Sequence, residues 1–162
     1  MRKFFIIPAF FVSSLIGSAQ PSPDYTSIKL EAKEDYTADV DKAALQAARL
    51  LLSTPGNDRD VSRLAAAQFL IRWMSGTPTY TFTLDERAGK FAKDDLLIVY
   101  MAAMVKYSLE HPADSKMEKV VQLNAVKGLL DYCRQFEVKM TGELKRLNAA
   151  NEKGELEKYL GK

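Results

Sequence analysis

Cysteine and histidine are nearly absent from this chain, and their scarcity excludes several kinds of chemistry. Cys133 is the only cysteine and His111 the only histidine. A single cysteine cannot form an intramolecular disulfide, so a packed core must stabilise the chain. One histidine and one cysteine also fall short of an ordinary transition-metal site. We therefore expect no metal centre and no other cofactor.

A dense run of basic residues is missing as well. The full chain has 23 basic and 21 acidic residues, but Arg2 and Lys3 account for the difference, so residues 20–162 are formally neutral. No segment has the clustered Lys and Arg that would neutralise a row of phosphates or draw the chain to an anionic membrane. The charge pattern therefore disfavours nucleic acid as a partner.

Long apolar runs are rare, and the longest lies at the N-terminus. Arg2 and Lys3 precede an apolar run over residues 4–16, and small residues at 17–19 follow it. This order is typical of a secretory signal peptide, and the run is too short to cross a ~30 Å hydrocarbon core. We predict cleavage between Ala19 and Gln20 and export to the periplasm or the exterior, without a membrane span in the mature chain. The alternative is an apolar N-terminal helix of the folded domain.

After the signal segment, the sequence predicts a short lead-in and one helical domain. Residues 20–36 begin with Pro21 and Pro23, which oppose helix formation, so we expect an extended N-terminal arm. Over residues 37–162, apolar side chains recur at the three-to-four spacing of helices. This length suits a single α-helical domain.

Proline stops predict where three of the helices end. They divide the domain into a helical hairpin near 38–75, a second hairpin near 94–140, and a C-terminal helix from Glu143. Short connections favour antiparallel neighbours, so the predicted fold is an all-α antiparallel helical bundle. The stops are Thr54-Pro55, Thr77-Pro78 and His111-Pro112.

Two of the predicted helices have unusually broad apolar surfaces. Residues 96–105 have no polar side chain except the Tyr100 hydroxyl, which predicts a helix at the centre of the bundle. The helix that starts near Asp58 or Asp60 carries apolar residues on two adjacent stripes, one of which includes Leu64 and Ile71. We expect that helix to contact more than one partner helix.

One segment breaks the helical rhythm. In residues 77–84, threonines alternate with Tyr80, Phe82 and Leu84, a period of two built from residues that favour strands. No second strand is evident, so we expect an extended aromatic and threonine loop that crosses the helices.

No set of catalytic residues emerges from the chain. His111 precedes Pro112 at a helix end, where an imidazole commonly caps backbone carbonyls. Cys133 lies on an apolar stripe, where a cysteine usually behaves as a small buried hydrophobe. The sequence does not place the carboxylates of Asp85-Glu86 opposite another acidic pair. We therefore predict that the protein is not an enzyme.

The region from Trp73 to Phe82 is the best candidate for a ligand or partner surface. It combines the only tryptophan with Tyr80, Phe82 and several hydroxyl groups, and Arg72 and Arg87 flank it. Aromatic faces beside hydroxyls suit an extended peptide or a sugar ring, and the arginines suit a carboxylate. The competing interpretation is that these aromatic rings fold back onto the bundle.

Two functions follow from these observations. The first is a non-enzymatic interaction module outside the cytoplasm that binds a protein or an extended peptide. The alternative is a small-ligand or glycan-binding protein, or a weak carboxylate-based hydrolase, that uses the same loop. The oligomeric state stays open.

Overall fold

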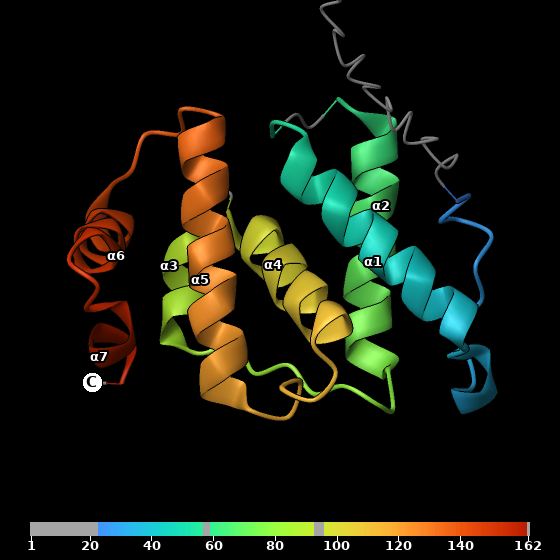
Figure 1. Cartoon of the computed structure of the whole chain (residues 1–162). Coiled ribbons are helices and arrows are strands. Elements are labelled where there is room, and N and C mark those ends of the chain that lie inside the picture. The colour runs from blue at the N-terminus through green and yellow to red at the C-terminus, as the bar shows by residue number, and fades with distance from the viewer. Residues whose placement is uncertain (1–22, 57–58, 93–95, 162) are drawn as a thin grey trace, which may run out of the picture.

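A single helix, α4 (Leu97–Glu110), occupies the centre of the molecule, with the other helices on its two sides (Figure 1). The computed structural model describes residues 23–56, 59–92 and 96–161, and over these residues it contains helices and connecting segments but no strand. The all-α bundle predicted from the sequence is confirmed. The remaining elements are η1 (Lys33–Asp35), α1 (Ala38–Ser53), α2 (Val61–Gly76), α3 (Glu86–Ala92), α5 (Glu118–Gln135), α6 (Gly142–Glu152) and α7 (Leu156–Leu160).

The central position of α4 follows from its composition. Almost every side chain from Val99 to Val105 is buried, because α1 covers one side of the helix and α5 covers another. Ala102 and Val105 face a core shared with α1 and α2, whereas Tyr100 and Met104 face a core shared with α3, α5 and α6. We call these the N-terminal core and the C-terminal core.

Side-chain caps set the starts of the first two helices. The Val40 N–H donates to the hydroxyl of Thr37 at 3.4 Å, and the Arg63 N–H donates to the carboxylate of Asp60 at 3.1 Å. Each cap satisfies a backbone donor that a helix start leaves unpaired. The predicted starts of α1 and α2 are therefore confirmed. The predicted start of α4 near residue 94 lies outside the described residues.

The prediction that α2 contacts more than one helix is confirmed, because α2 lies against α1 and, less extensively, α4. Phe69, Leu70 and Trp73 are buried, but Leu64 and Ile71 expose 51% and 46% of their surface. The stripe that includes Leu64 and Ile71 is therefore only partly covered.

The C-terminal half differs from the prediction in its helix boundaries. The second hairpin is predicted to extend to about residue 140, but its second helix, α5, begins at Glu118 and ends at Gln135. It ends there because Glu137 adopts a left-handed backbone conformation with φ of 52°, which cannot continue an α-helix. The expected C-terminal helix is divided into α6 and α7 by a turn at Gly154, where φ is 70° and glycine carries no steric penalty.

The described part of the lead-in lies on the N-terminal core. Tyr25 is buried and its ring stacks on Phe69 of α2, with 5.3 Å between ring centroids. The 3-10 turn η1 then leads into α1, so this arm is not extended throughout. The predicted signal peptide falls outside the described residues. Among the described helices, none is sufficiently long and apolar to cross a bilayer.

Candidate functional site

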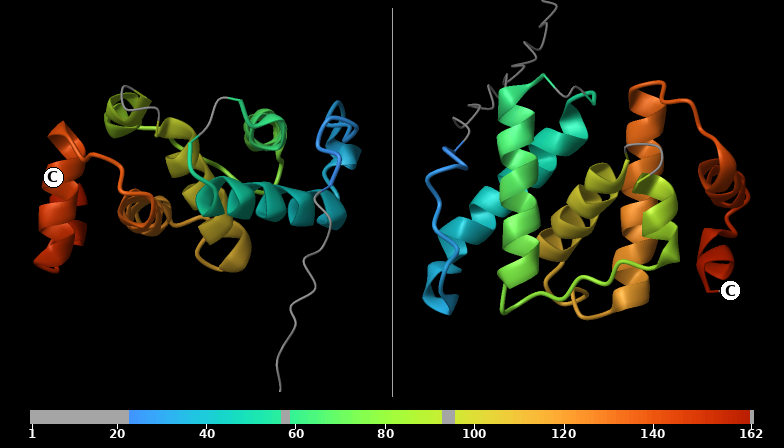
Figure 2. Two further views of the ribbon diagram at one scale, coloured as in Figure 1. Left: turned by 90° about the horizontal axis from the view of Figure 1, so that it is seen from above. Right: turned by 180° about the vertical axis from the view of Figure 1, so that it is seen from behind.

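The segment over residues 77–84 runs along one end of the bundle, from the end of α2 past α4 to the start of α3 (Figure 2). Thr77 still donates its N–H to the Trp73 carbonyl at 2.9 Å. From residue 78 to 84, by contrast, no backbone group has a hydrogen-bond partner within the described residues. Residues 78 and 79 form a bend and residues 80–84 have no regular secondary structure, so side chains, and not a ladder of backbone bonds, hold the segment in place.

Aromatic side chains anchor this segment from the inside. Trp73 is fully buried, and its ring centroid lies 5.6 Å from that of Tyr80 and 5.9 Å from that of Phe82. The Trp73 indole N–H donates to the carboxylate of Asp41 on α1 at 3.1 Å. Burial raises the pKa of Asp41 above its usual value, although this hydrogen bond opposes the shift. Trp73 therefore supports the segment from beneath and does not present a face to a partner.

Threonines make up the opposite side of the segment. Thr79, Thr81 and Thr83 are exposed, and they line a groove of about 210 Å³ whose other wall is Ser115, Lys116 and Glu118. The alternation read from the sequence therefore separates an anchored aromatic face from an accessible hydroxyl face. The second wall, between α4 and α5, was not anticipated because nothing in the sequence links it to residues 77–84.

The two flanking arginines are engaged elsewhere. Arg72 donates to the backbone carbonyl of Ile28 at 3.2 Å and so ties the lead-in to α2. Arg87 pairs with Asp85 at 2.6 Å and donates to the Leu160 carbonyl at 3.1 Å. Of the five residues predicted to form a surface, the structure brings Trp73, Tyr80 and Phe82 together, and it gives both arginines partners within the chain.

A larger, charged cleft of about 580 Å³ lies where α3 meets α6 and α7. Glu143 is nearly buried there, accepts a hydrogen bond from the Tyr159 hydroxyl at 3.1 Å, and lies 3.6 Å from both Lys90 and Arg146. The basic groups therefore compensate the carboxylate. No histidine, serine, threonine or cysteine lines the cleft, and its carboxylates are Asp85, Glu86 and Glu143.

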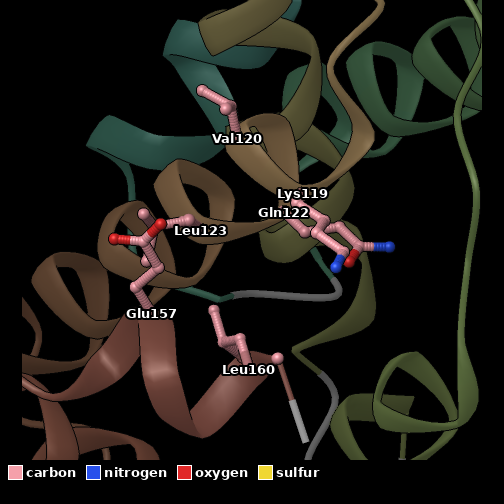
Figure 3. A pocket seen from close by; sticks show the side chains of 7 residues that line it. Lys119, Val120, Gln122, Leu123, Glu157 and Leu160 are labelled. Carbon is pink, nitrogen blue, oxygen red and sulfur yellow. The ribbon is translucent and has the colours of Figure 1, made fainter.

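Two further clefts among the described residues are less suited to chemistry. The cleft between α5 and α7 has a volume of about 70 Å³ and is lined by Leu123 from α5 and Leu160 from α7 (Figure 3). A volume this small is below that of ordinary ligand sites. The other, of about 380 Å³ between α4 and α5, includes His111. The His111 ring stacks on Tyr107 at 4.4 Å, and its Nδ1 lies 3.2 Å from the Tyr107 carbonyl oxygen, as expected for an imidazole at a helix end.

None of these four clefts is lined by Trp73, Tyr80, Phe82 or the buried Cys133. Within the described residues, no group of three or more His, Cys, Asp or Glu side chains is placed to hold a metal ion. Comparison with protein-family models, with curated proteins and with solved structures found no match. The candidate site consequently rests on the geometry of residues 77–84 alone.

Proposed function

We propose that this protein is a non-enzymatic interaction module that acts outside the cytoplasm and binds another protein through residues 77–84. The observation that carries the proposal is the anchored but unpaired backbone of this segment. Tyr80 and Phe82 hold the segment on Trp73, while its backbone groups have no partner in the described part of the chain. A segment whose backbone groups are free in this way can pair them with another polypeptide.

The dimensions of the site favour a polypeptide over a small ligand or a glycan. The threonine groove, at about 210 Å³, is smaller than the 300–1,000 Å³ typical of small-molecule pockets. A sugar ring needs an open aromatic face, but Trp73 is fully buried. Leu84 and Met117, which neighbour the groove-lining residues in sequence, are each about half exposed and add apolar surface for a protein partner.

Export is the second part of the proposal, and residues 1–19 support it. Mass spectrometry of the protein recovered from the exported fraction of expressing cells tests it. We expect the mature chain to begin at Gln20. Recovery of protein that still begins at Met1 would contradict cleavage and export.

Site-specific photo-crosslinking tests the binding surface. A photoreactive residue is placed at Thr81 in the segment, or at Ser62 as a matched exposed control at the other end of α2. We expect crosslinked adducts from position 81 and not from position 62, and we expect Tyr80→Ala to weaken them by removing an anchor. Equal adducts from both positions, or none from position 81, would refute the proposed surface.

A further inference from the structure

We propose that α2 is a docking surface for a second copy of this chain, whose own α2 packs against it in the antiparallel direction. The contact surface is the outer stripe of α2, which consists of four exposed residues: Val61, Leu64, Gln68 and Ile71. This stripe is separate from residues 77–84, so the contact adds to the proposed function and does not depend on it.

The outer stripe holds most of the large apolar side chains that the fold leaves exposed. Five such side chains are exposed in the described part of the chain, and three of them lie on this stripe. Val61 exposes 78% of its surface, and Leu64 and Ile71 about half of theirs, and none of the three belongs to either core. Single exposed apolar residues are common, but a row of them along one helix indicates a surface that another protein covers.

α2 also lacks the charges that exposed helices usually have. It is the only helix among the described residues without an acidic side chain, and it has no lysine. Both of its arginines bind groups within the chain, since Arg63 is buried at the end of α1 and Arg72 donates to the Ile28 carbonyl. Depletion of charge is typical of the centre of a protein interface. Two copies of the stripe can therefore meet without like-charge repulsion.

The outer stripe is accessible because α2 lies in the outer layer of the fold. Seen from behind, α2 passes in front of α1, and no other described helix lies in front of it (Figure 2). At 100° per residue, the buried Ala66, Leu70 and Trp73 lie on the side of the helix opposite the stripe. A second helix can therefore reach the stripe without displacing a contact of the monomer.

One antiparallel register pairs the whole stripe. Its residues repeat at intervals of three, four and three, which is the pattern of a helix–helix seam. With the two-fold axis level with residue 66, Val61 lies opposite the partner's Ile71, and Leu64 lies opposite the partner's Gln68. Symmetry repeats both pairs, so all three exposed apolar side chains of each copy are covered.

The residues beside this two-fold axis are small. Ala65 and Ala67 flank the stripe, and in this register each lies next to the same residue of the partner. Alanine side chains let two helices approach closely. Each helix is already folded within its monomer, so pairing does not incur the cost of helix nucleation. Four layers of side chains still form a small interface, and we expect a weak, reversible dimer.

Sedimentation of the mature chain over a range of concentrations tests the contact. Val61→Glu or Ile71→Lys alone sets a charge against an apolar side chain of the partner and should raise the dissociation constant at least about tenfold. The double variant should dimerise again, because the antiparallel register sets each glutamate opposite a lysine. A parallel pair would set like charges opposite each other. Ser62→Glu adds the same charge away from the stripe and should dimerise like wild type.

The single variants should remain folded, because both positions are exposed in the monomer. Glutamate near the start of a helix and lysine toward its end also suit the helix dipole. We therefore expect thermal midpoints close to that of wild type. A dimer that neither single variant weakens, or one that the double variant fails to restore, would overturn the antiparallel pairing.

Cysteine crosslinking gives a readout that does not depend on the charged variants. The native Cys133 is buried, so a short bismaleimide should leave the wild-type chain unlinked. Gln68→Cys lies on the stripe and should give covalent dimers, whereas the exposed control Ser62→Cys faces away and should not. Equal linkage from both positions, or a chain that stays monomeric at all concentrations, would overturn the proposal. Linkage of position 68 to a different protein by a monomeric chain would overturn it too.

Discussion

The N-terminal and C-terminal cores on the two sides of α4 are built from different side chains. The C-terminal core consists mainly of large aliphatic residues, with Leu129, Leu130, Leu144 and Leu147 almost completely buried. The N-terminal core combines a few large aromatic residues with many alanines, which let helices approach closely. These alanines are Ala43, Ala44, Ala47, Ala48, Ala66 and Ala102.

The N-terminal core also differs from the C-terminal core by a buried cation, Arg63, that lies beside it. The Arg63 guanidinium is buried beside the N-terminal core and donates to the Leu51 carbonyl at 2.7 Å and to the Thr54 carbonyl at 2.9 Å. These acceptors lie at the C-terminal end of α1, where the helix dipole favours positive charge. The guanidinium also lies 6.0 Å from the ring centroid of Tyr132 on α5. The C-terminal end of α1 is thus capped by the Arg63 side chain of α2.

A charge placed on α4 should unfold the protein, because both cores include residues of this helix. Val105 is fully buried, so Val105→Asp would leave an uncompensated carboxylate where α4 meets the N-terminal core. We expect a loss of more than about 4 kcal/mol and an unfolded chain by circular dichroism. Val61→Asp, at an exposed position of α2, is the control and should keep the native spectrum. A folded Val105→Asp protein with the wild-type midpoint would show that α4 is not central.

A cavity in the C-terminal core should have the next largest effect. Leu129 is fully buried between helices that have little freedom to collapse. Leu129→Ala should lower the free energy of unfolding by about 2–5 kcal/mol in urea denaturation. Leu84→Ala removes the same atoms from a half-exposed site and should cost much less. Similar losses for the two variants would contradict the assignment of this core.

Loss of the buried cation tests the N-terminal core. Arg63→Met keeps much of the apolar length but leaves the Leu51 and Thr54 carbonyls without their donor. We expect a loss of about 1–3 kcal/mol, smaller than for Leu129→Ala, with Arg63→Lys intermediate. Arg134→Met removes an exposed guanidinium and should change stability by no more than about 0.5 kcal/mol. If Arg63→Met is as stable as wild type, the guanidinium does not stabilise the end of α1.

The smallest expected effect is at Glu110, which forms one ion pair with α1 and one within α4. Glu110 accepts from Arg49 at 2.9 Å and from Lys106 at 2.7 Å. Burial raises the pKa of Glu110, but the hydrogen bonds and charges of these two cations lower it by more. Glu110→Gln should therefore cost less than about 1 kcal/mol at pH 7.

The pH dependence of this variant follows from the direction of the shift. Because the folded-state pKa is lowered, the carboxylate contributes stability above the unfolded pKa of about 4.3, and the contribution is lost as the pH falls through the folded value. Urea denaturation of wild type and Glu110→Gln at pH 7 and pH 3 should show the difference shrinking in acid. An equal difference at both pH values would rule out a charge effect.

Local features of the sequence were sufficient to predict most of the helical fold. Thr37 and Asp60 cap helices because their oxygens reach donors only three residues away, which is independent of distant contacts. The apolar run over residues 96–105 likewise leaves α4 no stable position except the centre. The end of α5 was missed because the left-handed conformation at Glu137 has no glycine to mark it.

For the candidate site, proximity along the chain was enough to bring Trp73, Tyr80 and Phe82 together as one aromatic group. Which of them would stay accessible depended on α1, whose Asp41 binds the buried indole. The groove beside the threonines likewise needed Ser115, Lys116 and Glu118 from a distant turn. Periodicity records which sides of a segment are apolar, because that is a property of spacing. It does not indicate which other helices cover those sides, because those helices come from elsewhere in the chain.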